Sequence, residues 1–396
     1  MLSVSGSRRW ALWGSELSPF ALKVELLLRV AGIPFDWMPA TGPFRVAARY
    51  ALRRERLVRG GLALTWPAMT VLDEFPQVPF LFGPDGETLY DSSAIGTWLV
   101  EHIPSSATAA VLPAHDPALR FAVRLVDEAL DEVGLYLVHH NRWVVAARDN
   151  DAGVRLSREL RPLLGPFARI PRRAFPRRQV RRLPYLFSVA PGDDAAFADL
   201  PRGLRPPTRR GFPATHALLE ERFHTLLVAI EPVLASRPFL FGDRPTLADA
   251  SVYGQLDMNR SDPSAWRSIA SRAPATARWI ERLARGEAGP ATPGTLVLDQ
   301  ALAPLLDWVA QTFVPLMTQN AAAWTRHREA GETVFNERAF DAGRALYDGT
   351  LVGRPFRSVA KTFQVRVWQD LQAEWLALPA TDRRRIGALV PVDGLG

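Results

Sequence analysis

Cysteine is missing from this sequence of 396 residues, and lysine is nearly missing. The lack of cysteine excludes disulfides, thiolate metal sites, cysteine nucleophiles and dithiol redox cycles within the polypeptide. Any thiol chemistry must therefore use a sulfur atom from another molecule. Lys23 and Lys361 are the two lysines among 48 basic residues, so arginine carries almost all of the positive charge.

Long hydrophobic runs are also missing. Arg, Asp or Glu interrupts every apolar stretch before it reaches the roughly 18 residues of a membrane span. The pair Arg8-Arg9 is followed by Glu16 and Lys23 rather than by an apolar region, so we expect no secretory signal and a cytoplasmic protein. With 47% hydrophobic and 22% charged residues, the composition is typical of a globular chain of two or three compact units.

The net charge of +7 is concentrated in residues 161–212, which hold 12 Arg, three Asp and nine Pro. Because proline and charge are so frequent there, we interpret this stretch as an irregular insertion. Its centre, residues 172–182, allows three interpretations: a solvated surface loop, a site for an anionic partner such as a membrane surface or nucleic acid, or a segment docked on acidic residues of the chain itself.

The first hundred residues predict the order strand, helix, strand, helix, strand, strand, helix, which is not that of a doubly wound sheet. Within the first helix, Leu22 and Leu26 face the core, whereas Lys23 and Glu25 are expected to face away. Gly83-Pro84-Asp85-Gly86 predicts a hairpin between the last two strands. The predicted strands are 10–13, 33–37, 78–82 and 87–90, and the predicted helices are 19–30, about 43–59, and from a cap at Ser92 or Ser93 to about 102.

From residue 116 onward the pattern is helical and no convincing strand appears. Residues 60–77 are interpreted as an added loop, and the Pro/Gly-rich stretch 288–294 as a boundary. The segment 353–368 is predicted to form a helix that packs on the bundle and closes a cleft. Helices are predicted at about 116–148, 214–236, 247–260, 264–270, 274–286, 296–330, 336–348 and 355–376.

Ser15-Glu16-Leu17-Ser18-Pro19-Phe20 joins the first strand to the first helix. A hydroxyl at this place lies at the positive end of a helix, where it can donate a hydrogen bond to an anion. The same residues also fit an ordinary N-cap, with Ser18 as the cap and Pro19 as the first helical residue. The two interpretations remain open at this level.

Two further features follow along the chain. Pro79 enters the third strand, where a proline removes a ladder donor, so Val78-Pro79 indicates either a special bond geometry or an edge strand. Asp91-Ser92 comes directly after the hairpin and begins a helix, whose free N–H groups suit a carboxylate, although any helix could begin this way. Far downstream, Thr246 and Asp249 fit a reciprocal helix cap with a structural role.

In this order and spacing, these features resemble the glutathione transferase family over residues 8–286. The resemblance implies an α/β thioredoxin-like N-terminal domain with a mixed four-stranded sheet, followed by an all-α helical-bundle domain with a helical C-terminal extension. The implied domains are a glutathione-binding domain at 8–104, a helical domain at 114–286 that contains the basic insertion 160–212, and the extension at 294–396.

The resemblance also implies roles for particular residues. Ser18, or as second choice Ser15, would lower the pKa of the glutathione thiol. Pro79 would be cis, with the backbone of Val78 holding the cysteinyl part of glutathione. Asp91 and Ser92 would hold the γ-glutamyl part. The residue that holds the glycine carboxylate is not assigned, and the candidates are Arg45, Arg49, Arg53 and Arg54.

The implied activity is transfer of the glutathione thiolate to an electrophilic small molecule, with glutathione as co-substrate and detoxification as the setting. The family often forms homodimers, and a homodimer is expected on that ground alone. The alternative is a non-catalytic binding or scaffolding module with the same fold. No metal is expected, because His139-His140 and the other histidines do not form a metal-ligand pattern with acids at fixed offsets.

Overall fold

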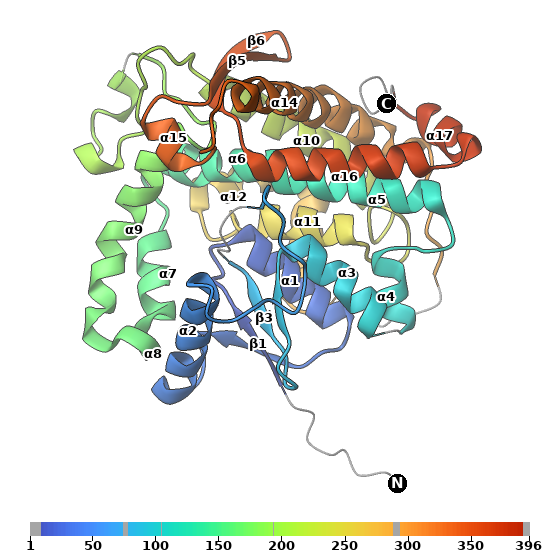
Figure 1. Ribbon diagram of the computed structural model, residues 1–396, viewed down its shortest axis with the longest axis horizontal. Helices are drawn as coiled ribbons and strands as arrows, with labels where there is room; N and C mark the ends of the chain where they lie inside the picture. The colour runs from blue at the N-terminus through green and yellow to red at the C-terminus, as the bar shows by residue number, and fades with distance from the viewer. Residues whose placement is uncertain (1–8, 74–77, 104, 193, 288–293, 391–396) are drawn as a thin grey trace.

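The computed structural model describes residues 9–73, 78–103, 105–192, 194–287 and 294–390. Residues 74–77 of the predicted loop and 288–293 of the predicted boundary lie outside the described residues. A four-stranded sheet occupies one end of the molecule, and helices form the remainder (Figure 1). Among the described residues, no helix is both long enough and apolar enough to cross a membrane.

The sheet has the order β2-β1-β3-β4, in which β1 and β2 run parallel and the other neighbours antiparallel. Successive residues point to opposite faces, so Leu12 and Leu81 join the core beneath α1 and α3, whereas Phe80 and Phe82 pack with residues of α2 on the other face. This is the predicted mixed sheet with the predicted element order. Its elements are β1 (Trp10–Trp13), α1 (Pro19–Val30), β2 (Phe35–Met38), α2 (Phe44–Val58), β3 (Phe80–Phe82), β4 (Thr88–Tyr90) and α3 (Ser92–His102).

The helical part packs on the sheet domain through α11, which crosses α1 at close range. Gly254 permits this approach, because a Cβ there would lie 2.3 Å from the carbonyl oxygen of Pro19. The long line of α5 and α6 is interrupted by π-helical turns at Leu130–Gly134 and Asn141–Val145. The helices after α3 and before the extension are α4 (Ser106–Val111), α5 (Pro117–Ala129), α6 (Leu135–His140), α7 (Ala152–Glu159), α8 (Arg161–Leu164), α9 (Arg169–Arg182), α10 (His216–Ser236), α11 (Leu247–Asp257), α12 (Pro263–Arg272) and α13 (Pro274–Ala284).

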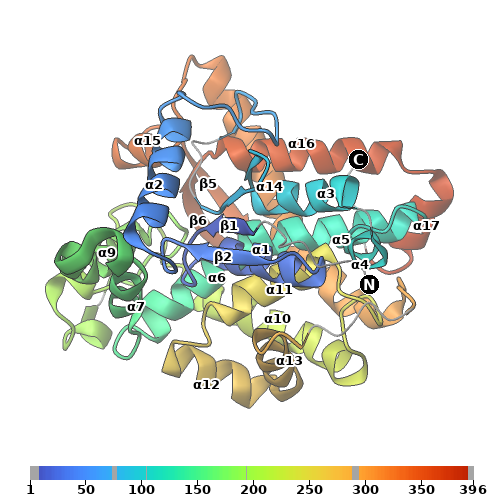
Figure 2. The ribbon, with the colours of Figure 1, turned by 90° about the horizontal axis from the view of Figure 1, so that it is seen from below.

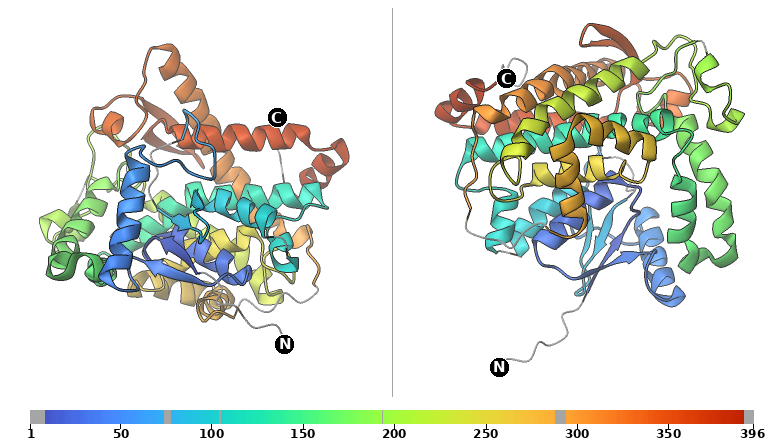
Figure 3. Two further views of the ribbon diagram at one scale, coloured as in Figure 1. Left: turned by 60° about the horizontal axis from the view of Figure 1, so that its bottom comes forward. Right: turned by 180° about the vertical axis from the view of Figure 1, so that it is seen from behind.

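The basic stretch is more regular than its composition indicates. The run that was interpreted as the centre of an irregular insertion is helical, because α9 spans Arg169–Arg182 with Pro176 inside it, so that interpretation is wrong for this part. Helices α7 and α9 pack side by side, and α8 contacts α2 of the sheet domain (Figure 3). The insertion therefore forms a helical arm beside the sheet.

The C-terminal extension lies along the helical domain, where α14 and α16 pack on each other and on α5 (Figure 2). It is mostly helical, but the expectation of no strand beyond residue 116 is wrong. The predicted helix 336–348 ends early, and β5 and β6 form an antiparallel hairpin closed at Val352-Gly353, where both residues have positive φ. The elements are α14 (Ala303–Glu329), α15 (Glu337–Asp341), β5 (Leu346–Leu351), β6 (Arg354–Val359), α16 (Thr362–Ala377) and α17 (Ala380–Gly387).

Candidate functional site

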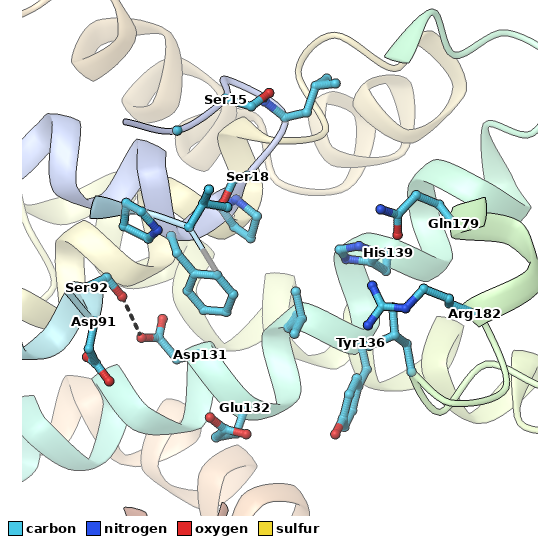
Figure 4. A pocket seen from close by; sticks show the side chains of 18 of the residues that line it. Ser15, Ser18, Asp91, Ser92, Asp131, Glu132, Tyr136, His139, Gln179 and Arg182 are labelled. Atoms are coloured by element: carbon cyan, nitrogen blue, oxygen red, sulfur yellow. Dashed lines mark hydrogen bonds between the residues drawn. The ribbon is translucent and has the colours of Figure 1, made fainter. Parts of the chain in front are cut away.

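A cavity of about 480 Å³ lies where the sheet domain, the helical domain and the extension meet. The turn before α1, the residues around β3 and the start of α3 form one side of it. The line of α5 and α6, together with α9 and the first residues of α16, forms the other side (Figure 4). Its size suits a small-molecule ligand, since such sites commonly measure 300–1,000 Å³.

Ser18 and Ser15 both line this cavity and are half-buried. Ser18 is the N-cap of α1, and its Oγ accepts a long hydrogen bond of 3.4 Å from the backbone N–H of Ala21. The Oγ of Ser15 accepts from the N–H of Leu17 at 3.1 Å. Ser18 is the acceptor in its bond, so its own proton is available to a ligand. The cap interpretation is confirmed for Ser18, and it is compatible with a ligand role.

The Val78-Pro79 peptide is cis, as the resemblance implied, and both residues line the cavity. Pro79 comes directly before β3, which is an inner strand between β1 and β4, so the edge-strand alternative is wrong and the backbone of Val78 lies at the end of that strand, lining the same cavity as Ser18. Met38-Pro39 and Trp66-Pro67 are cis as well, and Pro39 also lines the cavity.

Asp91, rather than Ser92 or Ser93, caps α3, and its Oδ1 accepts from the N–H groups of Ser93 and Ala94 at 3.0 and 3.1 Å. The φ of Asp91 is 67°, an uncommon conformation for a residue with a side chain. Its other oxygen, Oδ2, lies 3.2 Å from Nη2 of Arg366 on α16. The carboxylate that the resemblance assigns to a ligand ammonium is therefore already in contact with a cation from the extension.

Behind α3 lies a buried ion cluster that was not predicted. Lys23 was expected to face away from the core, but it is wholly buried, and its Nζ lies 2.6 Å from Oδ1 of Asp127 and 2.7 Å from Oδ2 of Asp131. It also donates to Oγ of Ser93 at 2.7 Å. The error arises because α3 and α11 cover α1 on sides that a single amphipathic stripe leaves free.

This cluster contacts the candidate site through Asp131, which lines the cavity and accepts from Oγ of Ser92 at 3.3 Å. Burial lowers the pKa of Lys23, but the two carboxylates outweigh burial and the net shift is upward. Burial raises the pKa of Asp131 above its usual range, and Lys23 opposes that rise. The floor of the site beneath Ser92 is therefore fixed by buried charge.

The far side of the cavity carries polar side chains from α6 and from one face of α9. Phe175, Gln179 and Arg182 line it, at the spacing of four and three residues that places side chains on one face of a helix. Arg178 and Arg181 lie on other faces of α9 and are exposed. The predicted basic run is thus divided between solvent and the site.

The extension completes this side of the cavity. The Nζ of Lys361 hydrogen-bonds to the hydroxyl of Tyr136, whose ring centroid it approaches to 4.5 Å. Gln364 donates to Oε2 of Glu132 and to the same hydroxyl, each at 2.9 Å. Burial raises the pKa of Tyr136 well above its ordinary value, so its hydroxyl stays protonated at neutral pH. These residues fix the start of α16 over the cavity. The helix predicted over 353–368 is wrong for Arg354–Val359, which form β6, and only residues 361, 363 and 364 of that segment line the cavity.

Other residues from the sequence analysis lie elsewhere. None of the four candidate arginines of α2, Arg45, Arg49, Arg53 and Arg54, lines the cavity. Arg53 donates instead to the carbonyl oxygen of Gly86 and to Oγ1 of Thr88, each at 2.6 Å. Among the described residues, no group of three or more His, Asp or Glu side chains could hold a metal ion.

The reciprocal cap is confirmed, since Oγ1 of Thr246 accepts from the N–H of Asp249 while Oδ2 of Asp249 accepts from the N–H of Thr246. Neither residue lines the cavity, in agreement with the structural role predicted for them.

Comparison with known proteins matches two segments of this chain to family domains, and the first of them carries cavity-lining residues. Residues 17–102 match the family model for the glutathione S-transferase N-terminal domain, and residues 213–282 match the model for the glutathione S-transferase C-terminal domain. A search of curated proteins gives no match. The arm α7–α9 and the extension lie outside both matched segments.

Solved structures of similar proteins include three that cover most of this chain. A glutathione S-transferase of Ceriporiopsis subvermispora in complex with glutathione is 17% identical, covers 71% of this chain and 97% of its own, and has a TM-score of 0.42. The beta-etherase LigF from Sphingobium sp. strain SYK-6 is 16% identical over 72% and 97% of the two chains, with a TM-score of 0.41. A glutathione S-transferase from Methylobacterium radiotolerans in complex with glutathione sulfonate is 20% identical over 74% and 99%, with a TM-score of 0.35.

Proposed function

Because the chain belongs to the glutathione S-transferase family, with a thioredoxin-like N-terminal domain and a helical C-terminal domain, we propose that it binds glutathione in the cavity and transfers the thiolate to an electrophilic small molecule. The observation that carries the proposal is the convergence of Ser18, the cis Val78-Pro79 peptide and Asp91-Ser92 on one side of a single cavity.

In this proposal the hydroxyl of Ser18 donates a hydrogen bond to the thiolate sulfur, and the N-terminus of α1 adds a favourable field. Lowering a thiol pKa from about 8.5 to about 6.5 needs roughly 3 kcal/mol of preferential stabilisation of the anion. A hydrogen bond to a charged group contributes about 1.5–3 kcal/mol, and a helix terminus about 0.3–1 kcal/mol. The two together are of the required size.

The chemical step is a substitution. The thiol proton leaves to water, the thiolate attacks an electrophilic carbon, and a carbon–sulfur bond forms as the leaving group departs with its electron pair. The backbone of Val78 would hold the cysteinyl part of glutathione, and Asp91 and Ser92 the γ-glutamyl part. Because the chain has no cysteine, reactions that need a protein thiol are outside this proposal.

One observation favours the non-catalytic alternative, a binding module with the same fold. Arg366 of the extension already pairs with Asp91, so the γ-glutamyl ammonium would have to share that carboxylate. A homodimer, which we propose on the family resemblance alone, and a cytoplasmic location, which we expect because no secretory apolar region follows Arg8-Arg9, stay predictions.

The test combines glutathione binding with conjugation to a generic aryl halide. We expect wild-type protein to be retained on a glutathione resin and Ser18→Ala to lower kcat/KM about 10- to 100-fold, since it removes a charge-assisted hydrogen bond. The bound thiol should titrate at higher pH in the variant. Ser15→Ala, the matched control in the same turn, should change kcat/KM far less.

Ser18→Gly keeps the helix start, because glycine at an N-cap costs only a few tenths of a kcal/mol, and it should reproduce the loss seen in Ser18→Ala. Absence of retention on the resin, together with absence of protection against heat by glutathione, would contradict the proposal and favour the binding module. If Ser15→Ala causes the larger loss, the roles of the two serines are exchanged.

A further inference from the structure

The half of the cavity that faces away from Asp91 is built largely by segments outside the matched family domains. Figure 4 shows Asp91, Ser92, Asp131 and Glu132 on one side and Gln179, His139 and Arg182 on the opposite side. The acidic groups therefore lie toward the start of α3, while the guanidinium of Arg182 lies across the cavity from them. This separation of charge orients any ligand that carries a charge of its own.

We propose that this half is the site for the second substrate, and that it selects a flat, apolar electrophile bearing a carboxylate or sulfonate, which Arg182 and Gln179 bind. The inference rests on the proposed function in one respect, because it takes the bound anionic molecule to be the electrophile that the glutathione thiolate attacks. Binding of the anion itself requires only the geometry of the cavity.

Arg182 has hydrogen-bonding capacity left for such a group. Its side chain is 13% exposed, and its Nε donates to Oε2 of Glu337 at 2.9 Å. Neither Nη of Arg182 donates to any residue in the described part of the chain. A guanidinium has five N–H donors in a rigid fork, so it can pair with Glu337 along one edge and with a ligand carboxylate along the other.

Gln179 adds a second polar group one helical turn before Arg182. Its Oε1 is buried without a hydrogen-bond partner among the described residues, which is a costly state for an amide. An amide oxygen only accepts, so the amide must turn by 180° and present Nε2 to the cavity in order to bind an anion. A ligand oxygen in the cavity would give this amide the partner that the protein does not provide.

His139 lines the same side of the cavity as Arg182 and Gln179, and it adds no charge there. Burial first, and then the positive charges of Arg142 and Arg182, lower the pKa of His139 to about 3, so the ring is neutral at pH 7. Arg142 is already satisfied by Asp262 at 2.7 Å and by backbone carbonyls. Of these two guanidinium groups, Arg182 is therefore the one with donors to offer a ligand.

The walls between the charged ends are apolar, and Trp143 and Phe175 give them two aromatic side chains. The cavity has the volume of a site for a small organic ligand, and on this side apolar side chains lie between its polar groups. The ring of Tyr185 holds the guanidinium of Arg182 at 5.6 Å from its centroid, which limits the directions in which that group can turn. The apolar lining on this side consists of Leu135, Trp143, Leu156, Leu160, Phe175 and Leu186.

The test compares 2-naphthoate with 2-naphthamide by isothermal titration calorimetry, with and without glutathione. The two probes share one ring system and differ in charge. We expect wild-type protein to bind the carboxylate at least about tenfold more tightly, and Arg182→Gln to abolish that preference, since hydrogen bonds to charged groups are worth at least this ratio. Arg181→Gln, the matched control on an exposed face of α9, should keep the preference.

We expect Arg182→Gln to fold. It leaves Glu337 without its partner, but the side chain of Glu337 is 32% exposed and water can hydrate the carboxylate. Gln179→Leu, which leaves the Arg182–Glu337 pair intact, should also weaken the carboxylate several-fold and the amide less. Equal binding of the two probes by wild-type protein, or no binding of either, would overturn the inference. So would a loss of glutathione affinity in Arg182→Gln, because the guanidinium would then belong to the glutathione site.

The two proposals fail separately in this design. A preference for the carboxylate without any heat of glutathione binding would contradict the proposed function and leave the anion site standing. Glutathione binding and aryl halide conjugation without that preference would leave the proposed function standing and remove the anion site.

Discussion

The buried cluster around Lys23 makes the sharpest prediction about stability. Lys23→Met removes the cation and fills most of its volume with an apolar chain. Asp127 and Asp131 then remain buried beside each other without a counter-ion, and Ser93 loses a donor. The substitution therefore tests whether buried charge supports the start of α3 and the serines of the candidate site.

The size of the effect follows from the geometry. At 2.6 and 2.7 Å and an effective dielectric of about 20, each carboxylate gains about 6 kcal/mol of Coulomb energy from Lys23, and desolvation of the three groups offsets most of it. Removing one partner of such a buried pair typically costs about 3–5 kcal/mol. That is a large part of the 5–15 kcal/mol by which folded domains are usually stable.

The dependence on pH gives the prediction its sign. Burial already raises the pKa of Asp131 and Lys23 opposes that rise, so without Lys23 the folded-state pKa of Asp131 lies further above the unfolded value of about 3.9. The penalty for its buried charge is therefore absent below that pH and grows as pH rises through the folded pKa. Lys23 stays charged over this whole range, because its pKa is raised, and its attraction for Asp131 is complete only where Asp131 is ionised. The deficit of the variant should therefore be larger at pH 8 than at pH 5.

Urea denaturation of both proteins at pH 5 and pH 8 measures this difference. Arg59→Met is the matched control, since Arg59 pairs with Glu55 at 2.8 Å but its side chain is 77% exposed. An exposed pair of this kind is worth about 0.3–0.5 kcal/mol. A deficit below about 1 kcal/mol for Lys23→Met, or the same deficit at both pH values, would refute the reasoning.

Two other buried groups carry predictions of their own. Asp249→Ala should cost about 3 kcal/mol in urea denaturation, because Asp249 accepts from the N–H of Leu240 at 2.7 Å and from both donors of Thr246, which would lose their acceptor; a cost under 1 kcal/mol would contradict this. Burial first, and then His216, lower the pKa of His140 to about 3, so its contribution is complete above about pH 6.5 and is lost as pH falls toward 3. The free energy of unfolding should therefore fall between pH 7 and pH 5 by about 2 kcal/mol less in His140→Phe than in the wild type. If it falls equally in both proteins in unfolding experiments, His140 does not have this role.

The features that the sequence predicted correctly are encoded within a few residues. A cis proline at a strand entry, a hairpin at Gly83–Gly86 and a reciprocal cap at Thr246 each depend on short-range sterics and hydrogen bonding. The element order of the first hundred residues follows from such signals. The glutathione side of the candidate site is assembled from these local features, which is why it could be proposed before the structure.

The features that were missed depend on contacts between distant residues. Lys23 has the spacing of a solvent-facing residue in α1, and only the approach of Asp127 and Asp131, more than a hundred positions away, makes it a buried ion. The hairpin β5–β6 turns at Val352-Gly353, where a valine with φ of 49° replaces the asparagine or aspartate that usually marks such a turn.

The side of the cavity that carries Arg182 and Gln179 shows why a count of charged residues cannot assign function. Arg178, Arg181 and Arg182 are all arginines of one helix, yet Arg182 alone of the three lines the cavity. Its face of α9 is turned toward the cavity, and its Nε donates to Glu337, 155 residues later in the sequence. The run 172–182 is a helix and not the solvated loop of the first interpretation, although most of its arginines are exposed, and Arg182 docks on an acid of the chain as the third interpretation has it. A basic run in a helix is decided residue by residue, by which face the tertiary structure covers.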